Sequence, residues 1–429
     1  MLKSNSGIMK LFVCAFFGAV LLAFSTSAMA AETEIPAETV QLIESNISDF
    51  VKEIWVLDRD CDLAPLLADG SEDVAEYYAK RRRIIFGGWE IYDDWYPEIS
   101  SEIELKKLEE NGDGTFTVEA VAKMVQISVR RPESPEYEYV PYTFVLSSAA
   151  DGCRIVSVHT DDTIDSIIAT TPVEEHLAKL AESYQRTLES LRSGVSLDPE
   201  MDRIEAEHME AERMAVAAGT SIAYDRDAAV AYAGSHYNSY NRGFKDRSPA
   251  DCQNFASQCV WAGYGGTTPP ANTDAISDPM VYYYNGSSAR NWYGTAGDAS
   301  ESWVRCSAFK NYIATCDASK KGPVGWVYDR TSTCLRYAQP GDIIYIYYRD
   351  NTDGLPDHAY VVVSTENAYG SNNVNTIYVS AHTNDCYGFA LKNRQYDEDE
   401  FALVRMGTWH SGSSTAASAR MRRDHARRQ

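Results

Sequence analysis

The sequence predicts an α+β protein with two domains and a helical connector between them. In the N-terminal half, two stretches of helical periodicity precede three strand-like runs, and in the C-terminal half a half-buried helix precedes three more. The chain has 429 residues, which is long enough for more than one domain. Its composition, 44% hydrophobic and 24% charged, is typical of a globular protein and not of a disordered one.

The first 30 residues have the pattern of a secretory signal peptide. Lys3 and Lys10 precede an apolar run at 11–24, and small residues then lead to a cleavage site after Ala30. No later stretch of the sequence is long and apolar enough to span a bilayer. We therefore expect a secreted, extracellular protein without stable membrane insertion.

Residues 36–168 form the smaller predicted domain, which is itself α+β. The expected elements are helices at 38–57 and 72–86 and strands at 115–129, 137–146 and 153–158. Two helices followed by an antiparallel meander suit, by analogy, a fold of the nuclear-transport-factor or cystatin kind. Residues 172–218 are charged and helix-prone, and we expect them to form a connector of one or two helices with a break near Gly194 and Pro199.

Most of the acidic charge lies in this N-terminal part of the chain. Residues 31–220 carry 41 acidic and 17 basic side chains, a net charge of −24, whereas residues 221–429 carry 21 and 20, a net charge of −1. Such a balance excludes nucleic acid as an expected partner. Residues 413–429 are the exception, and we expect them to form a basic, disordered tail.

The segment 248–259 predicts a helix whose first turn carries a cysteine. Ser248 is the expected N-cap, and Pro249 suits the first helical position. The apolar stripe of this helix comprises Cys252, Phe255, Ala256, Cys259 and Val260. Because the positive end of a helix lowers the pKa of a thiol there, Cys252 is a candidate nucleophile. The backbone N–H groups at the same end can hold an oxyanion.

Three strand-like runs downstream supply candidates for a base and for the group that orients it. These runs cover 343–348, 358–363 and 376–384. His358 begins the second run, and His382 and Asn384, two residues apart on the third, would share one face of a strand. A thiol on a helix end, an imidazole that opens one strand and a polar group on the next form a papain-like arrangement.

Four blocks in this order resemble the putative amidase domain family. They are 224–233, 251–259, 358–363 and 381–385, and the resemblance spans 221–412. The family is similar to papain-like hydrolases of the NlpC and CHAP types. The resemblance therefore implies a papain-like domain in which a helix that bears Cys252 packs on an antiparallel sheet.

The resemblance also implies the roles of the site residues. Cys252 would be the nucleophile and His358 the base. Relatives of the NlpC type carry a His in the third role, which favours His382, whereas papain-like enzymes use an Asn, so Asn384 remains an alternative. Tyr224 and the backbone N–H of Cys252 are the candidate oxyanion donors.

Export would permit disulfides among the eight cysteines that remain after Cys14 leaves with the signal peptide. Cys252 must stay free as a nucleophile, and Cys259, on the same helix face, is expected to be a buried thiol. The expected pairs are Cys61–Cys153, Cys306–Cys316 and Cys334–Cys386. The sequence has no paired C-x-x-C and no H-E-x-x-H spacing, so we expect neither a metal nor another cofactor.

These observations favour an exported cysteine hydrolase that cleaves an amide bond in a peptide or peptidoglycan substrate. In this hypothesis, Cys252 attacks the carbonyl and His358 transfers the proton to the leaving amine. The alternative is a non-catalytic binding or wall-associated protein with a degenerate hydrolase fold. In that alternative, the thiol and the imidazole serve only as packing residues.

Overall fold

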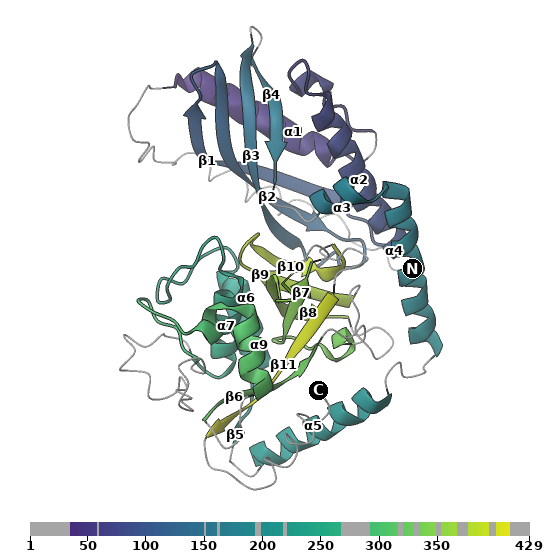
Figure 1. Ribbon diagram of the computed structural model, residues 1–429, viewed down its shortest axis with the longest axis vertical. Coiled ribbons are helices and arrows are strands. Elements are labelled where there is room, and N and C mark those ends of the chain that lie inside the picture. Colours follow the sequence, from purple (N-terminus) through teal and green to yellow (C-terminus); the bar gives the residue numbers. More distant parts are fainter. Residues whose placement is uncertain are drawn as a thin grey trace, which may run out of the picture. The chain divides into compact units, whose positions relative to one another are not determined.

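The computed structural model describes most of the chain from residue 35 to residue 411 (Figure 1). The described ranges are 35–57, 60–149, 152–160, 164–193, 199–217, 221–266, 292–315, 321–329, 334–348, 353–366, 376–393 and 400–411. The predicted signal peptide at 1–30 and the predicted tail at 413–429 lie outside these ranges. The protein is α+β with a large antiparallel sheet, which confirms the predicted fold class at that level. Within the described ranges, no helix is both long and apolar enough to cross a membrane.

Residues 37–159 form two helices and a four-stranded antiparallel meander. The helices are α1 (Ala37–Ile54) and α2 (Glu72–Tyr92), with a short 3-10 turn at Ala64–Leu66 between them. The strands pair in chain order and are β1 (Glu98–Glu110), β2 (Thr115–Ile127), β3 (Glu136–Ala149) and β4 (Gly152–His159). Phe50 of α1 packs edge-on against Tyr78 and Phe144, with ring centroids 5.0 and 5.7 Å apart. These contacts bury the apolar faces that the helical periodicity predicts.

Strand β1 is the element of this region that the sequence did not predict. Its segment is rich in Glu and Lys, and Leu108 is its one fully buried residue. The strand pairs with β2 along one edge over its whole length, and it is the terminal strand of the sheet, with side chains that are mostly exposed or half-buried. Charged side chains of this kind protect the edge of a sheet, but they hide the alternation by which a strand is recognised in a sequence.

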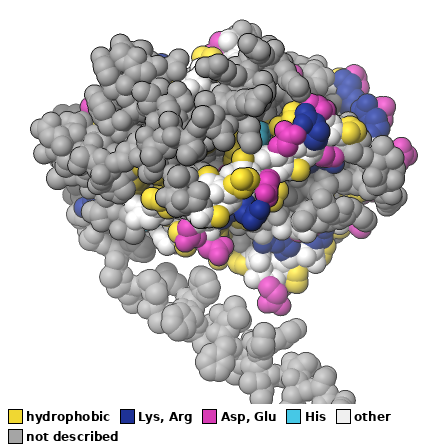
Figure 2. Space-filling model, turned by 90° about the horizontal axis from the view of Figure 1, so that it is seen from below, with side chains coloured by type: hydrophobic (Ala, Val, Ile, Leu, Met, Phe, Trp, Pro, Cys, Tyr) yellow, Lys and Arg dark blue, Asp and Glu magenta, His cyan; other side chains and the backbone are white. Residues whose placement is uncertain are grey.

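The predicted connector at 172–218 contains two helices, α4 (Val173–Ser193) and α5 (Pro199–Ala217), and α3 (Ile164–Thr170) precedes it. Residue 194 of the predicted break lies outside the described residues. Helix α5 carries ion pairs between residues one turn apart: Arg203 pairs with Glu200 and Arg213 pairs with Glu210, each at 2.7 Å. Acidic and basic side chains also lie next to each other on the face drawn in Figure 2. Pairs of this type stabilise a solvated helix only modestly, by about 0.2–0.5 kcal/mol each.

The C-terminal region combines four helices with an antiparallel sheet. The helices are α6 (Arg226–His236), α7 (Cys252–Gly263), α8 (Glu301–Val304) and α9 (Cys306–Thr315), with short 3-10 turns at Cys334–Tyr337 and Leu391–Asn393. The strands pair in the order β10 (Cys386–Ala390), β9 (Ile377–Ala381), β8 (His358–Thr365), β7 (Ile343–Tyr347) and β11 (Glu400–Ser411). Strands β5 (Ser221–Ile222) and β6 (Lys321–Tyr328) both pair with β11, and β10 also pairs with β3.

Helices α6, α7 and α9 gather beside the strands of this sheet (Figure 1). The buried cluster between helices and sheet contains Phe255 of α7, Phe309 of α9 and Tyr345 of β7, none of which is exposed to solvent. From Gln253 to Gly263, every residue of α7 is buried. Helix α7 is therefore fixed along its length, and its first residue is held at a defined position against the sheet.

No disulfide joins the cysteines within the described ranges, so the predicted pairs Cys61–Cys153 and Cys334–Cys386 are not formed. The Cys334 thiol instead donates to the carbonyl of Phe401, with 3.5 Å between sulfur and oxygen, and Cys153 and Cys386 are buried. These thiols pack as small apolar residues, which sequence spacing alone does not distinguish from disulfide partners. Cys316 lies outside the described residues, so the predicted pair with Cys306 stays a prediction.

Candidate active site

Helix α7 begins at Cys252, three residues later than predicted. Its N-cap is Asp251, and Ser248 and Pro249 lie in the preceding turn. The backbone N–H of Asp251 donates to Oγ1 of Thr383 at 3.1 Å, while its carbonyl accepts from the N–H of Phe255 at 2.9 Å. Because the hydrogen bonding of Asp251 changes from the loop to the helix at this residue, Cys252 becomes the first helical residue. Its thiol lies at the positive end of the helix dipole.

The partly exposed Cys252 thiol has two side-chain partners. Its sulfur lies 3.8 Å from the sulfur of Cys306, the first residue of α9, and the imidazole of His358 is close enough to lower the pKa of the thiol. The hydrogen bond from Cys306, then the charge and hydrogen bond of His358 and the backbone of Ala359, hold the pKa of Cys252 well below its ordinary value, although burial opposes the shift. The predicted nucleophile and base therefore meet, and the thiolate is the stable form of the nucleophile.

His358 opens strand β8, as predicted, and is 6% exposed. In the sheet, His358 lies opposite Ile346 of β7, and its ring packs edge-on against the ring of Tyr360 at a centroid distance of 4.4 Å. Strands β7 and β8 lie under α7, so the start of β8 reaches the start of the helix. The register of two central strands thus fixes the position of the imidazole relative to the thiol.

Tyr345 of β7 ties the first turn of α7 to the sheet. Its hydroxyl donates to Oε1 of Gln253 at 2.6 Å, and Nε2 of Gln253 donates to Oγ of Ser257 at 3.0 Å. Burial raises the pKa of Tyr345 well above its ordinary value. The phenol is therefore neutral and holds the residue that follows the nucleophile.

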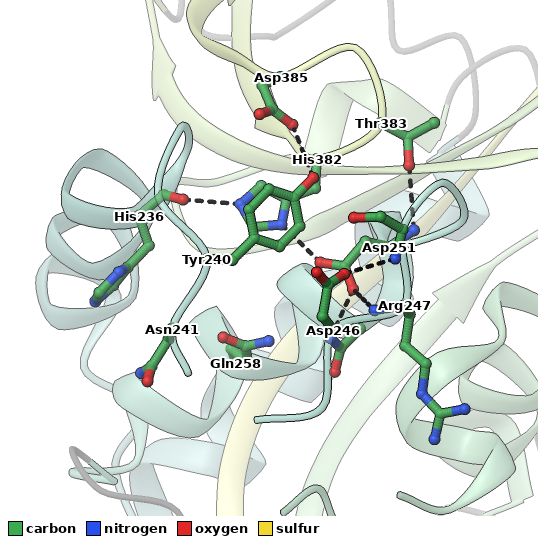
Figure 3. A network of polar contacts seen from close by, with 12 residues as sticks. His236, Tyr240, Asn241, Asp246, Arg247, Asp251, Gln258, His382, Thr383 and Asp385 are labelled. Carbon is green, nitrogen blue, oxygen red and sulfur yellow. Dashed lines mark hydrogen bonds and ion pairs between the residues drawn. The ribbon is translucent and has the colours of Figure 1, made fainter. Parts of the chain in front are cut away.

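His382 does not contact His358 through its ring nitrogens, because both have other partners (Figure 3). Nδ1 lies 2.7 Å from Oδ2 of Asp251, and Nε2 lies 2.8 Å from the carbonyl oxygen of His236. The rings of Phe255 and Tyr240 pack on the imidazole at 4.1 and 4.3 Å. His382 is thus a buried group that fixes the residue immediately before the nucleophile.

The polar network around Asp251 reinforces this position. Oδ1 of Asp251 accepts from Nδ2 of Asn254 at 2.7 Å and from the backbone N–H of Arg247 at 3.1 Å. His382 thus lies between two acceptors, a carboxylate oxygen of Asp251 and the carbonyl oxygen of His236. Figure 3 shows these residues converging on the start of α7 from the loop before it and from the turn after β9.

The structure corrects the predicted placement of His382 and Asn384 on one strand face. Strand β9 ends at Ala381, and residues 382–385 form a turn in which Thr383 and Asn384 have φ angles of 67° and 61°. Alternation of side chains does not continue through such left-handed residues, which Asn tolerates well. The roles of both residues in catalysis stay predictions.

Tyr224 is not at the thiol. Its hydroxyl donates to the carbonyl of Gly341 at 2.8 Å, and its ring packs so closely on Gly263, at the far end of α7, that a Cβ there would lie 2.1 Å from it. Tyr224 is therefore a packing residue in this structure, and the predicted oxyanion role is wrong for it. Of the two predicted donors, the backbone N–H of Cys252 is at the site.

Cys306 is the site residue that the sequence did not reveal. The sequence prediction paired Cys306 with the nearby Cys316 in a disulfide, because its actual partner, Cys252, is 54 residues upstream. One pattern does distinguish it, because Cys306, Phe309 and Ile313 repeat at helical spacing and put a cysteine at the start of a second apolar helix face. Within the described ranges, no group of three or more His, Cys, Asp or Glu residues is arranged to hold a metal ion.

Comparison with known proteins identifies the region that carries this site. Residues 223–404 match the model of a family described as putative amidase domain, which confirms the predicted resemblance. Over 160 residues, the chain is 29% identical to the uncharacterized protein YhbB of Bacillus subtilis (strain 168), a match that covers 37% of this chain and 43% of that relative. The chain thus spans less than half the length of the relative. No solved structure matches the chain.

Proposed function

We propose that the protein is an exported cysteine hydrolase that cleaves an amide bond in a peptide or in peptidoglycan, a proposal that the match of residues 223–404 to a putative amidase domain supports. The contact between the Cys252 thiolate and the His358 imidazole, at the positive end of α7, is the observation that carries this proposal. A cysteine thiolate beside an imidazole is the arrangement that cysteine hydrolases use for nucleophilic attack.

The reaction follows from the positions of these groups. Sγ of Cys252 attacks the carbonyl carbon, and the negative charge on the carbonyl oxygen is stabilised by the backbone N–H of Cys252 at the helix end. His358 then gives its proton to the leaving amine, so that the C–N bond breaks and a thioester remains. In the second half, His358 takes a proton from water, the resulting hydroxide attacks the thioester, and Cys252 is released as the thiolate.

The amide substrate can be identified with the full chain. We would incubate it with insoluble peptidoglycan and, separately, with a mixed peptide library, and analyse the products by mass spectrometry. The proposal predicts new amines and carboxylates in equal amounts, because hydrolysis makes one of each. If the protein is retained on one of these materials but releases product from neither of them, then it is a binding protein and the proposal fails.

His382 and Asp251 are expected to act as positioning residues for the nucleophile. Replacing His382 with alanine leaves the Asp251 carboxylate buried without its ring partner, a change that costs about 3–5 kcal/mol for a buried pair. The first turn of α7 then moves, and a displacement near 1 Å is enough to lower kcat by roughly 10²-fold. We would measure kcat, the thermal midpoint and the pH profile of Cys252 alkylation for His382→Ala.

A matched variant separates positioning from simple loss of stability. His382→Asn keeps a side-chain donor for Oδ2 of Asp251, so it should retain more activity than His382→Ala and a thiolate profile close to that of the unaltered protein. A purely structural role would lower the thermal midpoint without moving the alkylation profile of the folded protein. If both variants keep full kcat, then His382 has no part in catalysis, direct or indirect.

A further inference from the structure

Two helices that are far apart in the sequence both begin with a cysteine at the same place. Cys252 is the first residue of α7 and Cys306 is the first residue of α9, and their sulfurs are 3.8 Å apart. A disulfide requires about 2.05 Å between sulfurs, so a movement of less than 2 Å would join them. Cys306 belongs to the buried apolar cluster between the helices and the sheet, and the partly buried Cys252 packs against that cluster.

The segment that carries Cys306 is fixed to α7 by hydrogen bonds. Nε1 of Trp303 donates to Oδ1 of Asn254 at 2.7 Å, and Oγ of Ser257 donates to the carbonyl of Trp303 at 2.8 Å. The Trp303 ring is fully buried and stacks on Phe244 at a centroid distance of 5.4 Å. Because Trp303 is three residues before Cys306, these bonds keep the two thiols adjacent.

The two thiols differ in protonation, as a reacting pair requires. Donation to Cys252 raises the pKa of Cys306 well above its ordinary value, and burial and the charge of Cys252 act in the same direction. Cys252 is therefore the thiolate, which reacts with oxidants, and Cys306 is the neutral thiol that waits beside it. Cys259, buried on the same helix, has a pKa raised by burial and is not part of this pair.

We propose that Cys306 is a resolving thiol, which closes a reversible disulfide with Cys252 after a peroxide has oxidised the nucleophile. In the first step, the Cys252 thiolate attacks one peroxide oxygen, the O–O bond breaks, and a sulfenic acid and hydroxide form. In the second step, the sulfur of Cys306 attacks the sulfenic sulfur, the S–O bond breaks, and the oxygen leaves as water with the Cys306 proton. Two electrons pass from sulfur to the peroxide, and a dithiol reductant restores both thiols.

The consequence of this modification rests on the proposed function, because a disulfide would occupy the nucleophile and stop hydrolysis. Export, also part of that proposal, would expose the pair to an oxidising environment in which disulfides persist. Without Cys306, the sulfenic acid of Cys252 would continue to the irreversible sulfinic acid. The resolving thiol thus converts permanent damage into a reversible off state.

The disulfide can be detected without any substrate. The reduced full chain is treated with hydrogen peroxide, its remaining thiols are alkylated, and its peptides are mapped by mass spectrometry. We expect one peptide pair that links residues 252 and 306, with a loss of about 2 Da for the two hydrogens removed, and full reversal by dithiothreitol. In Cys306→Ser, Cys252 should be trapped by dimedone as a sulfenic acid; in a parallel sample without dimedone, it should gain about 32 Da as the sulfinic acid, without reversal.

The control is Cys259→Ala, which should form the same linked peptides as the unaltered chain. Linkage of Cys306 to Cys316 in place of Cys252 would overturn the proposal, as would irreversible oxidation of Cys252 while Cys306 stays a thiol. If the 252–306 disulfide forms but the protein hydrolyses no amide, then the proposed function is wrong and the resolving role of Cys306 stands. If the protein hydrolyses an amide but the disulfide does not form, then the resolving role is wrong and the proposed function stands.

Discussion

Replacing Cys252 with alanine is expected to lower the rate of amide hydrolysis by on the order of 10⁴-fold or more. The variant lacks the sulfur that forms the thioester in the proposed reaction, whereas the helix that carries it is buried from Gln253 to Gly263. The fold should therefore remain, and the thermal midpoint should change little. The measurement is product formation from the amide substrate at saturating concentration, with circular dichroism as the check of folding.

Cys259→Ala is the matched control for this loss. Cys259 lies two turns further along α7, is 0% exposed, and has a pKa raised by burial. It has no route to the substrate, so its removal should affect stability and leave kcat close to the original value. Equal losses of activity in the two variants would show that Cys252 matters for packing and not for chemistry.

Replacing His358 with alanine should lower kcat by about 10³-fold, within the usual range for a general acid–base group. In the proposed reaction, His358 gives a proton to the leaving amine, and its charge also helps to keep the pKa of Cys252 low. The variant should therefore show a slower alkylation of Cys252 at neutral pH as well as a lower kcat. His159→Ala, at an exposed position on β4, is the matched control for loss of an imidazole.

The combination of both changes gives a stricter test of shared function. When two residues act as one unit, the effects of replacing them on the rate are not additive. The double variant Cys252→Ala, His358→Ala should therefore hydrolyse the substrate no more slowly than Cys252→Ala alone. A double variant that loses the product of the two single effects would mean that thiol and imidazole act independently. The papain-like arrangement would then be an incorrect description of this site.

The thiol and imidazole at the centre of the site could be predicted because local patterns determine their positions. Cys252 begins a helix and His358 begins a buried strand, as these patterns predict, although α7 is buried on all sides from Gln253 to Gly263 and not along one stripe. The helix start was predicted too early because Ser248 and Pro249 satisfy the usual rules for an N-terminus. The bond from Asp251 to Thr383, 132 residues away, sets the true start, and no local rule contains it.

The third member of the site could not be found in this way. The prediction for His382 and Asn384 assumed that β9 continues to residue 384, but the chain turns at 382 and gives Thr383 and Asn384 positive φ angles. Cys306 was missed for a different reason. Its partner is on another helix, and only the packing of α8 and α9 on α7 brings the two sulfurs together.

The pH dependence of Cys252 alkylation is the most direct test of the central claim that this thiol is an activated nucleophile. The native chain is treated briefly with iodoacetamide from about pH 5 to about pH 9, a range that includes the ordinary thiol pKa of about 8.5, and labelling at each cysteine is measured by peptide mass spectrometry. Because the pKa of Cys252 is lowered and that of Cys259 is raised, Cys252 should already label rapidly below neutral pH while Cys259 stays unlabelled. Labelling of Cys252 that rises only near pH 8.5, as for an ordinary thiol, would contradict the account.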